Sequence, residues 1–234
     1  MNTVCIVIGL VFLINVIVGW ARGFFRVLIS VAGAIAAIVV ALYLAPYVSG
    51  YIHENTKTDD KLAVYISKEL GFSKEEEETS KGVQVDIIEG LPLPGTMKNN
   101  ILDNNNLETY DILKATGVYD YISKSVAVVI LNGAVFLVLM LVCWILFKFL
   151  GLLVKGISSI PIIRSMDKFG GGILGAIQGL IMIWVFFLIL SITSTFPLSQ
   201  TLIKNISESQ LLKLLYDNNI LLDIVGDLTK VLFL

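Results

Sequence analysis

Four runs of apolar residues without a charged side chain constrain this fold more than any other feature. They cover residues 4–20, 27–45, 126–147 and 173–192. A hydrocarbon core about 30 Å thick is crossed by roughly 17–25 helical residues, so each run is long enough. In hydrocarbon, the backbone amides of such a run pair only within a helix. The sequence therefore predicts an all-α fold: an integral membrane bundle of four transmembrane helices with a helical extracytoplasmic loop.

Composition supports this class and excludes others. Only 15% of the residues are charged, against about 25% in a typical soluble domain. The net charge of −2 and the lack of a basic tract exclude nucleic acid as a partner. Cys5 and Cys143 both lie in apolar runs and have neither metal-site nor disulfide spacing. The N-terminus lacks the basic region and cleavage site of a secretory signal, so we expect a retained span.

Charge alternates between the connections and predicts the topology. The loop 46–125 holds eight lysines against fourteen Asp and Glu, whereas the two short connections are basic. Short cytoplasmic loops retain Lys and Arg, so both termini and the long loop are expected outside. The topology-determining residues are Arg22, Arg26, Lys148, Lys155, Arg164 and Lys168. The expected parts are a transmembrane hairpin 1–45, an extracytoplasmic loop 46–125, a second transmembrane hairpin 126–193 with a basic cytoplasmic connection 148–172, and an extracytoplasmic amphipathic tail 194–234.

The polar segments carry weaker patterns. Apolar residues at helical spacing predict a helix over 58–69 and another over 106–123 that leads into the third span, while Pro46 is expected to end the second span. A turn is expected at 91–95, and 151–169 is expected to lie along the inner interface. Two short helices are expected within 207–234. The acidic patch 72–82 lacks calcium-loop spacing at Glu75–Glu78, so we interpret it as solvated.

Glycines at intervals of four indicate close helix packing. Gly171, Gly175 and Gly179 form a stripe along the fourth run, and Gly19 and Gly23 repeat the spacing at the end of the first. Small residues let membrane helices approach closely. Packing within the bundle is the simpler interpretation, and a homo-oligomer contact is the alternative. The segment 170–175 also matches G-x-G-x-x-G, but it lacks the flanking strand and downstream acid of a dinucleotide site.

The amides Asn15, Asn132 and Gln178 lie inside the runs, which contain no Asp, Glu, Lys, Arg or His. Such amides usually form hydrogen bonds between helices, although the same residues would line a polar path. His53, in the outer loop, is the one histidine. No nucleophile motif, metal site or cofactor site is recognisable. We therefore expect no catalytic, cofactor-binding or metal residues, and no enzyme.

Three segments carry a family resemblance, namely "NVIVGWARGFFRVLISVAGAIAA", "SMDKFGGGILGAIQGLIMIWVFFLIL" and "ISESQLLKLLYDNN". They resemble the colicin V production protein family (CvpA), of the longer type from Gram-positive bacteria. Similar features in the family are a basic R-G turn after the first helix and a D-x-x-x-G-x-x-x-G-x-x-x-G approach to the last span. Here that approach falls on Asp167, Gly171, Gly175 and Gly179. The resemblance implies a multi-pass protein of the bacterial cell membrane, linked to production or export of a peptide toxin and to envelope homeostasis.

Three functional hypotheses follow. The first is a non-enzymatic scaffold or export accessory that contacts an envelope or export protein through its outer loop, besides the lipid bilayer. The second is a small channel or transporter subunit with Asn15, Asn132 and Gln178 along its path. The third is a membrane enzyme that uses His53 and the acids of the outer loop.

Overall fold

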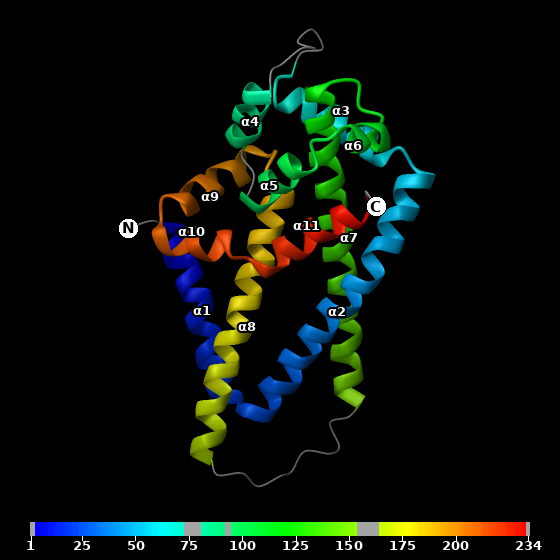
Figure 1. Ribbon diagram of the computed structural model, residues 1–234. Helices are drawn as coiled ribbons and strands as arrows, with labels where there is room; N and C mark the ends of the chain where they lie inside the picture. The colour runs from blue at the N-terminus through cyan, green and yellow to red at the C-terminus, as the bar shows by residue number, and fades with distance from the viewer. Residues whose placement is uncertain (1–2, 73–80, 92–94, 154–163, 233–234) are drawn as a thin grey trace. The chain divides into compact units, whose positions relative to one another are not determined.

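The computed structural model describes residues 3–72, 81–91, 95–153 and 164–232, and the regular elements in these ranges are all α-helices (Figure 1). In chain order they are α1 (Thr3–Arg22), α2 (Phe24–Asn55), α3 (Thr58–Glu69), α4 (Lys81–Gly90), α5 (Gly95–Asp103), α6 (Leu107–Leu113), α7 (Val118–Leu153), α8 (Arg164–Ile192), α9 (Pro197–Ser207), α10 (Gln210–Asp217) and α11 (Ile220–Leu232).

Four of these helices are long and apolar enough to cross a membrane: α1, α2, α7 and α8. The predicted all-α architecture with four such helices is therefore confirmed. Each helix extends past its apolar run, and α2 does not end at Pro46 as expected but continues to Asn55. Proline removes one N–H donor from the helical ladder, and helices of this apolar kind tolerate that loss. The expected stop was therefore wrong.

The chain divides into two compact units. The first unit comprises Met1–Leu44 and Leu137–Phe187, and the second comprises Ala45–Phe136 and Leu188–Leu234. In the first unit, α1 packs on α8 through glycines, and Phe147 of α7 lies beside Gly33 of α2. This unit contains the two basic connections. Asp167 is the one acidic residue in its sequence.

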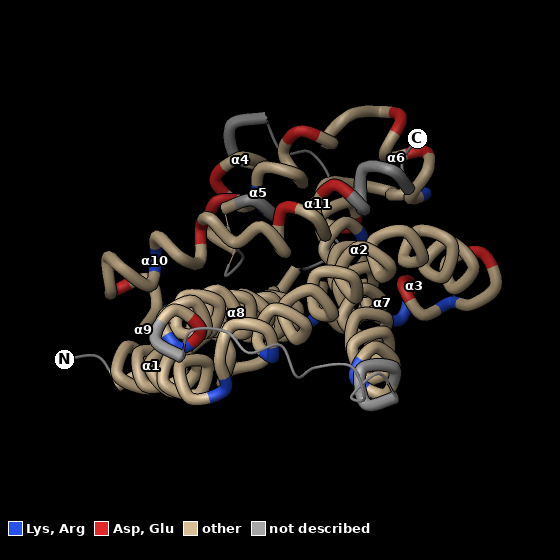
Figure 2. Tube along the Cα trace, turned by 90° about the horizontal axis from the view of Figure 1, so that it is seen from below, with Lys and Arg blue, Asp and Glu red and all other residues tan. Residues whose placement is uncertain are grey.

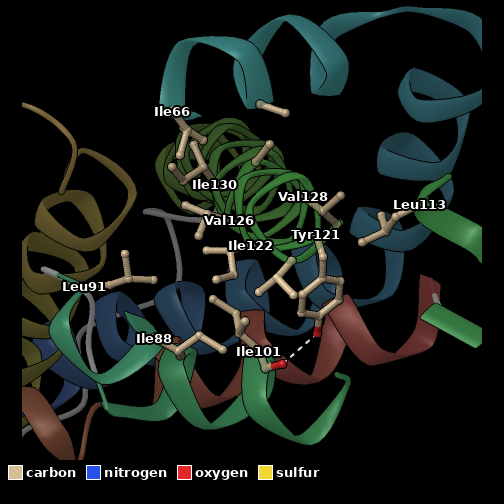
Figure 3. Packing of buried hydrophobic residues seen from close by; sticks show 13 residues of the cluster. Ile66, Ile88, Leu91, Ile101, Leu113, Tyr121, Ile122, Val126, Val128 and Ile130 are labelled. Carbon is tan, nitrogen blue, oxygen red and sulfur yellow. Dashed lines mark hydrogen bonds between the residues drawn. The ribbon is translucent and has the colours of Figure 1, made fainter. Parts of the chain in front are cut away.

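The core of the second unit is built around the N-terminal part of α7. Tyr121 and Ile122 of α7 are fully buried against Ile66 of α3 and Ile88 of α4 (Figure 3). The Tyr121 hydroxyl donates to the Ile101 carbonyl of α5 at 2.6 Å. Val126, Ala127, Val128 and Ile130 also belong to this core. The start of the run expected as the third span therefore packs against protein, which explains its apolar character without lipid.

The tail also belongs to the second unit. α11 packs against α5, and the amide side chain of Asn100 occupies the space where Gly226 has no Cβ. α4 packs against α5 in turn. The segments α4, α5 and α11 thus form one packed group, although about half of the chain separates α5 from α11 in sequence.

The predicted helix over 58–69 is confirmed as α3. The helix expected over 106–123 is instead two helices, because Lys114 adopts a left-handed conformation (φ 50°) that ends α6. In the tail, α10 and α11 match the two expected helices, while α9 was not predicted. Some of the sequence-based interpretations concern residues outside the described ranges. They are those of Glu75–Glu78, Lys155 and the centres of the segments 91–95 and 151–169.

Candidate functional site

A single residue connects α1 to α2. Gly23 has φ +83°. This backbone conformation is unfavourable for residues that have a side chain, whereas glycine adopts it readily. The Gly23 N–H donates to the Gly19 carbonyl at 3.0 Å, and its own carbonyl accepts from the Val27 N–H at 3.3 Å. The turn between the arginines is therefore as tight as the sequence indicated.

Asp167, at the start of α8, binds this turn. The Phe24 N–H donates to Oδ1 of Asp167 at 2.8 Å, so the carboxylate caps the N-terminus of α2. A Cβ at Gly23 would collide with the same carboxylate. Carboxylates at helix N-termini are favoured because they accept from free N–H groups and oppose the positive end of the helix dipole. Sequence reasoning gave Asp167 no role, although it is the one acid among the basic connections.

The predicted packing glycines face one another across α1 and α8, and we call this contact the glycine seam. It consists of Gly19 and Gly23 on α1 and its turn, and Gly171, Gly175 and Gly179 on α8. A Cβ on Gly19 would lie 2.8 Å from the Gly175 Cα, and one on Gly171 would lie 2.8 Å from the Gly23 carbonyl carbon. Gly179 faces the side chains of Phe12 and Asn15. Because α1 of the same chain covers the stripe, no second copy occupies it.

The basic residues of the first unit gather at one end of its helices (Figure 2). Arg22, Arg26 and Lys168 are exposed. The Lys148 ammonium lies 4.0 Å from the centre of the Trp144 ring, a cation–π contact. Arg164 begins α8, and Lys155 lies outside the described residues. An exposed cluster of cations beside apolar helices is suited to anionic lipid headgroups.

The three amides are divided between the two units. The Asn15 side chain donates to the Val11 carbonyl of its own helix at 2.8 Å, and Gln178 is half-buried on α8. Both belong to the first unit, whereas Asn132 belongs to the second. There its Oδ1 accepts a hydrogen bond from the Ser49 hydroxyl, which joins α7 to α2.

Asn132 is part of a buried polar layer in the second unit. The Ser191 hydroxyl of α8 and the Tyr216 hydroxyl of α10 are 2.9 Å apart. Burial raises the pKa of Tyr216 to about 12, so its hydroxyl stays protonated at neutral pH. Asn219 is fully buried, and its Oδ1 accepts from the Leu221 N–H at 3.0 Å. Within the second unit, hydrogen bonds between uncharged side chains therefore join α2 to α7 and α8 to α10.

A cleft of about 710 Å³ lies between α3 and the start of α7. Its lining includes Asp60, Lys68, Phe72, Tyr119 and Ser123. The rings of Phe72 and Tyr119 pack with centroids 4.6 Å apart. The Ser123 hydroxyl is buried there without a hydrogen-bond partner. A cleft with apolar rings, charges of both signs and an open hydroxyl is suited to a polar peptide segment.

The side chain of His53, near this region, contacts an acidic residue. Its Nδ1 is 2.6 Å from Oδ2 of Asp59, which joins the end of α2 to the start of α3. Within the described ranges, no group of three or more His, Cys, Asp or Glu side chains is arranged to hold a metal ion.

The family model for colicin V production protein matches residues 4–73 and 114–219, well over half of the chain. The match leaves out 74–113, which contain α4, α5 and α6, and everything after 219, where α11 begins. Neither the curated proteins nor the solved structures yield a match.

Proposed function

Because this chain belongs to the colicin V production protein family, we propose that it is a non-enzymatic scaffold or accessory of the bacterial cell membrane. It would act in the production or export of a peptide toxin and in envelope homeostasis. Its work would be to hold a partner at the membrane, without bond-making chemistry and without a cofactor.

The glycine seam is the observation that carries this proposal. Where Gly19 meets Gly175, backbone lies on backbone at van der Waals distance, so the pair leaves no room for a solute between the two helices. The amides that would line a path are engaged elsewhere: Asn15 bonds its own helix, and Asn132 bonds Ser49. A rigidly packed helix pair supports a scaffold more than the alternative, a small channel or transporter subunit.

The proposed orientation places the basic end of the first unit in the cytoplasm. Arg22, Arg26, Lys148 and Lys168 support it, because short cytoplasmic loops retain Lys and Arg. Both termini, α3 to α6 and the tail would then be extracytoplasmic. Tags at both ends should be cut by protease added to intact protoplasts, and a protected tag at either end would contradict this orientation.

The cleft between α3 and α7 is the proposed contact for the envelope or export partner. A photo-reactive benzoylphenylalanine at Val64, which lines the cleft and is 72% exposed, tests this in living cells. The matched control is the same residue at Leu107, which is 86% exposed and outside the cleft. We expect a discrete adduct at position 64 that Lys68→Glu removes, and none at position 107.

The channel alternative has its own readout. Purified protein in liposomes should show no solute or ion flux above that of empty vesicles. Flux that Asn132→Leu abolishes would overturn the scaffold and establish the channel.

A further inference from the structure

We propose that the tail helices α9, α10 and α11 lie in the outer interface of the bilayer and bury a set of exposed apolar side chains in its lipid. The proposal rests on the membrane location proposed above. It adds a second kind of membrane contact, parallel to the surface, to the four crossing helices.

Contacts with α7 and α8 fix the depth of the tail. Tyr216 of α10 bonds Ser191, one residue before the end of α8. At a rise of 1.5 Å per residue, the apolar run from Ile173 to Ile192 is about 29 Å long, close to the thickness of the hydrocarbon core. α10 therefore lies level with the end of a complete span.

The contact of α11 with α7 gives the same depth. A Cβ on Gly133 would lie 3.5 Å from Cγ1 of Val225, and 2.8 Å from the side chain of Ile192. Gly133 is about 21 Å from Phe147, the last residue of the apolar run in α7. α11 thus crosses α7 inside that run, at the level where α8 ends, rather than above it.

The direction of the tail fits a membrane surface. Residues 118–136 of α7 belong to the same unit as the tail. In Figures 1 and 2, α10 and α11 run crosswise to this part of α7, which is upright in the first view and nearly end-on in the second, while both tail helices extend across each view. If α7 crosses the bilayer, α10 and α11 lie along its plane.

Two of the tail helices, α9 and α10, have three sides, which is the pattern of a helix held between protein, lipid and water. On α10, Leu212 and Tyr216 are buried in the second unit, Lys213 and Asp217 are exposed on another side, and Leu214 is 61% exposed between them. α9 repeats the arrangement, with Ile203 and Ile206 buried, Lys204 exposed on one side and Leu198 exposed on another. Among the tail side chains whose burial the structure describes, the large apolar ones that are at least half exposed are Phe196, Leu198, Leu211, Leu214 and Ile220.

Two observations identify the occupant as lipid. Residues 193–196 reach at most about 14 Å, so α9 begins close to the end of the α8 span. The charges of the tail are nearly balanced, with Lys204, Lys213 and Lys230 against Glu208, Asp217, Asp223 and Asp227. Attraction to anionic headgroups therefore does not account for binding of the tail to the membrane. Burial of its apolar side chains is sufficient for binding, even to zwitterionic lipid.

Nitroxide labels in the full-length protein test the proposal in phosphatidylcholine nanodiscs. The background is Cys5→Ala and Cys143→Ala, and single labels are placed by Leu198→Cys and Leu214→Cys. The matched control is Lys213→Cys on the charged side of α10, and the reference for a span is Val138→Cys, at a position 61% exposed on α7. We expect labels at 138, 198 and 214 to collide more often with oxygen than with a water-soluble nickel complex, and the label at 213 to show the reverse.

The outcomes distinguish a failure of the tail proposal from a failure of the proposed membrane location. A lipid-like label at 138 with water-like labels at 198 and 214 would overturn the tail proposal alone, whereas a water-like label at 138 would overturn the membrane location itself. Spin–spin broadening at 214 that disappears on dilution with unlabelled protein would identify a second copy as the occupant and also overturn the proposal. Accessibility unchanged by added phosphatidylglycerol supports apolar burial, and inward movement that requires it would contradict that mechanism.

Discussion

The backbone N–H of Phe24 donates a 2.8 Å hydrogen bond to Oδ1 of Asp167, across 143 positions of sequence. This bond fixes the turn between α1 and α2 to the first turn of α8. It lies at the end of the first unit where the basic residues gather, next to the first contacts of the glycine seam. Electrostatic capping and close helix packing thus meet at one place.

Replacing Asp167 tests the cap. Asp167→Ala should lower the free energy of unfolding by about 0.5–2 kcal/mol, the usual cost of a lost N-cap. Asp167→Asn keeps an oxygen acceptor and should cost less. Unfolding of the purified protein in mixed micelles measures both. Lys168→Ala, at an exposed neighbour, is the control and should change stability by less than about 0.5 kcal/mol. Equal losses of stability at positions 167 and 168 would show that the Asp167 cap does not stabilise the protein.

Two glycine substitutions separate packing from backbone propensity. Gly175→Ala places a methyl group against the Asn15 carbonyl and the Gly19 Cα, and should destabilise the protein by about 1–3 kcal/mol. Gly9→Ala, in an open position on α1, should instead be neutral or stabilising by up to about 1 kcal/mol. The same micelle assay compares them. A stabilising Gly175→Ala would contradict the seam.

The Ser49–Asn132 bond is suited to a double-mutant cycle. Either Ser49→Ala or Asn132→Leu leaves the other polar group buried without this partner, and each should cost about 1–3 kcal/mol. The double mutant should cost less than the sum of the two by about 0.6–1.7 kcal/mol, the range of measured hydrogen bonds between membrane helices. Additive effects would show that the bond does not contribute.

Tyr216 predicts a loss of stability at high pH. Its folded pKa of about 12 exceeds the ordinary value of 10.0 because the hydroxyl is buried. Between these values the unfolded chain has lost the proton and the folded chain retains it. Stability is therefore fully present below pH 10 and falls as the pH rises to 12, by at most about 1.4 kcal/mol per pH unit. In unfolding curves recorded from pH 8 to 12, Tyr216→Phe should show a shallower decline than the parent, and parallel curves would refute the prediction.

The spans and the tight basic turn could be predicted because lipid imposes simple demands on a sequence: length, absence of charge, and helix. The glycine spacing likewise indicated a stripe before its partner was known. Local pattern could not assign that partner, because nothing in Gly171 or Gly175 specifies α1 rather than another helix. The hydrogen bond between Phe24 and Asp167 could not be predicted from the sequence for the same reason.

The third run shows a different limit. Four residues at its start are as apolar as the rest of the run, yet they belong to the same protein core as Ile66 and Ile88. They are Val126, Ala127, Val128 and Ile130. Apolar side chains satisfy lipid and a protein interior equally, so composition does not separate the two. The continuation of α2 beyond Pro46 was missed because the proline rule was formed on helices in water.

The packing of α11 on α5 has an evolutionary consequence. Both helices lie in stretches that the family match omits, and the Asn100 side chain fills the space left by Gly226. Each helix covers part of the buried face of the other, so an ancestor that gained only one of them would have left that part uncovered. Relatives should consequently inherit or lack the two insertions as a pair, and a lineage that has lost the stretch around α5 should have a shortened C-terminus as well.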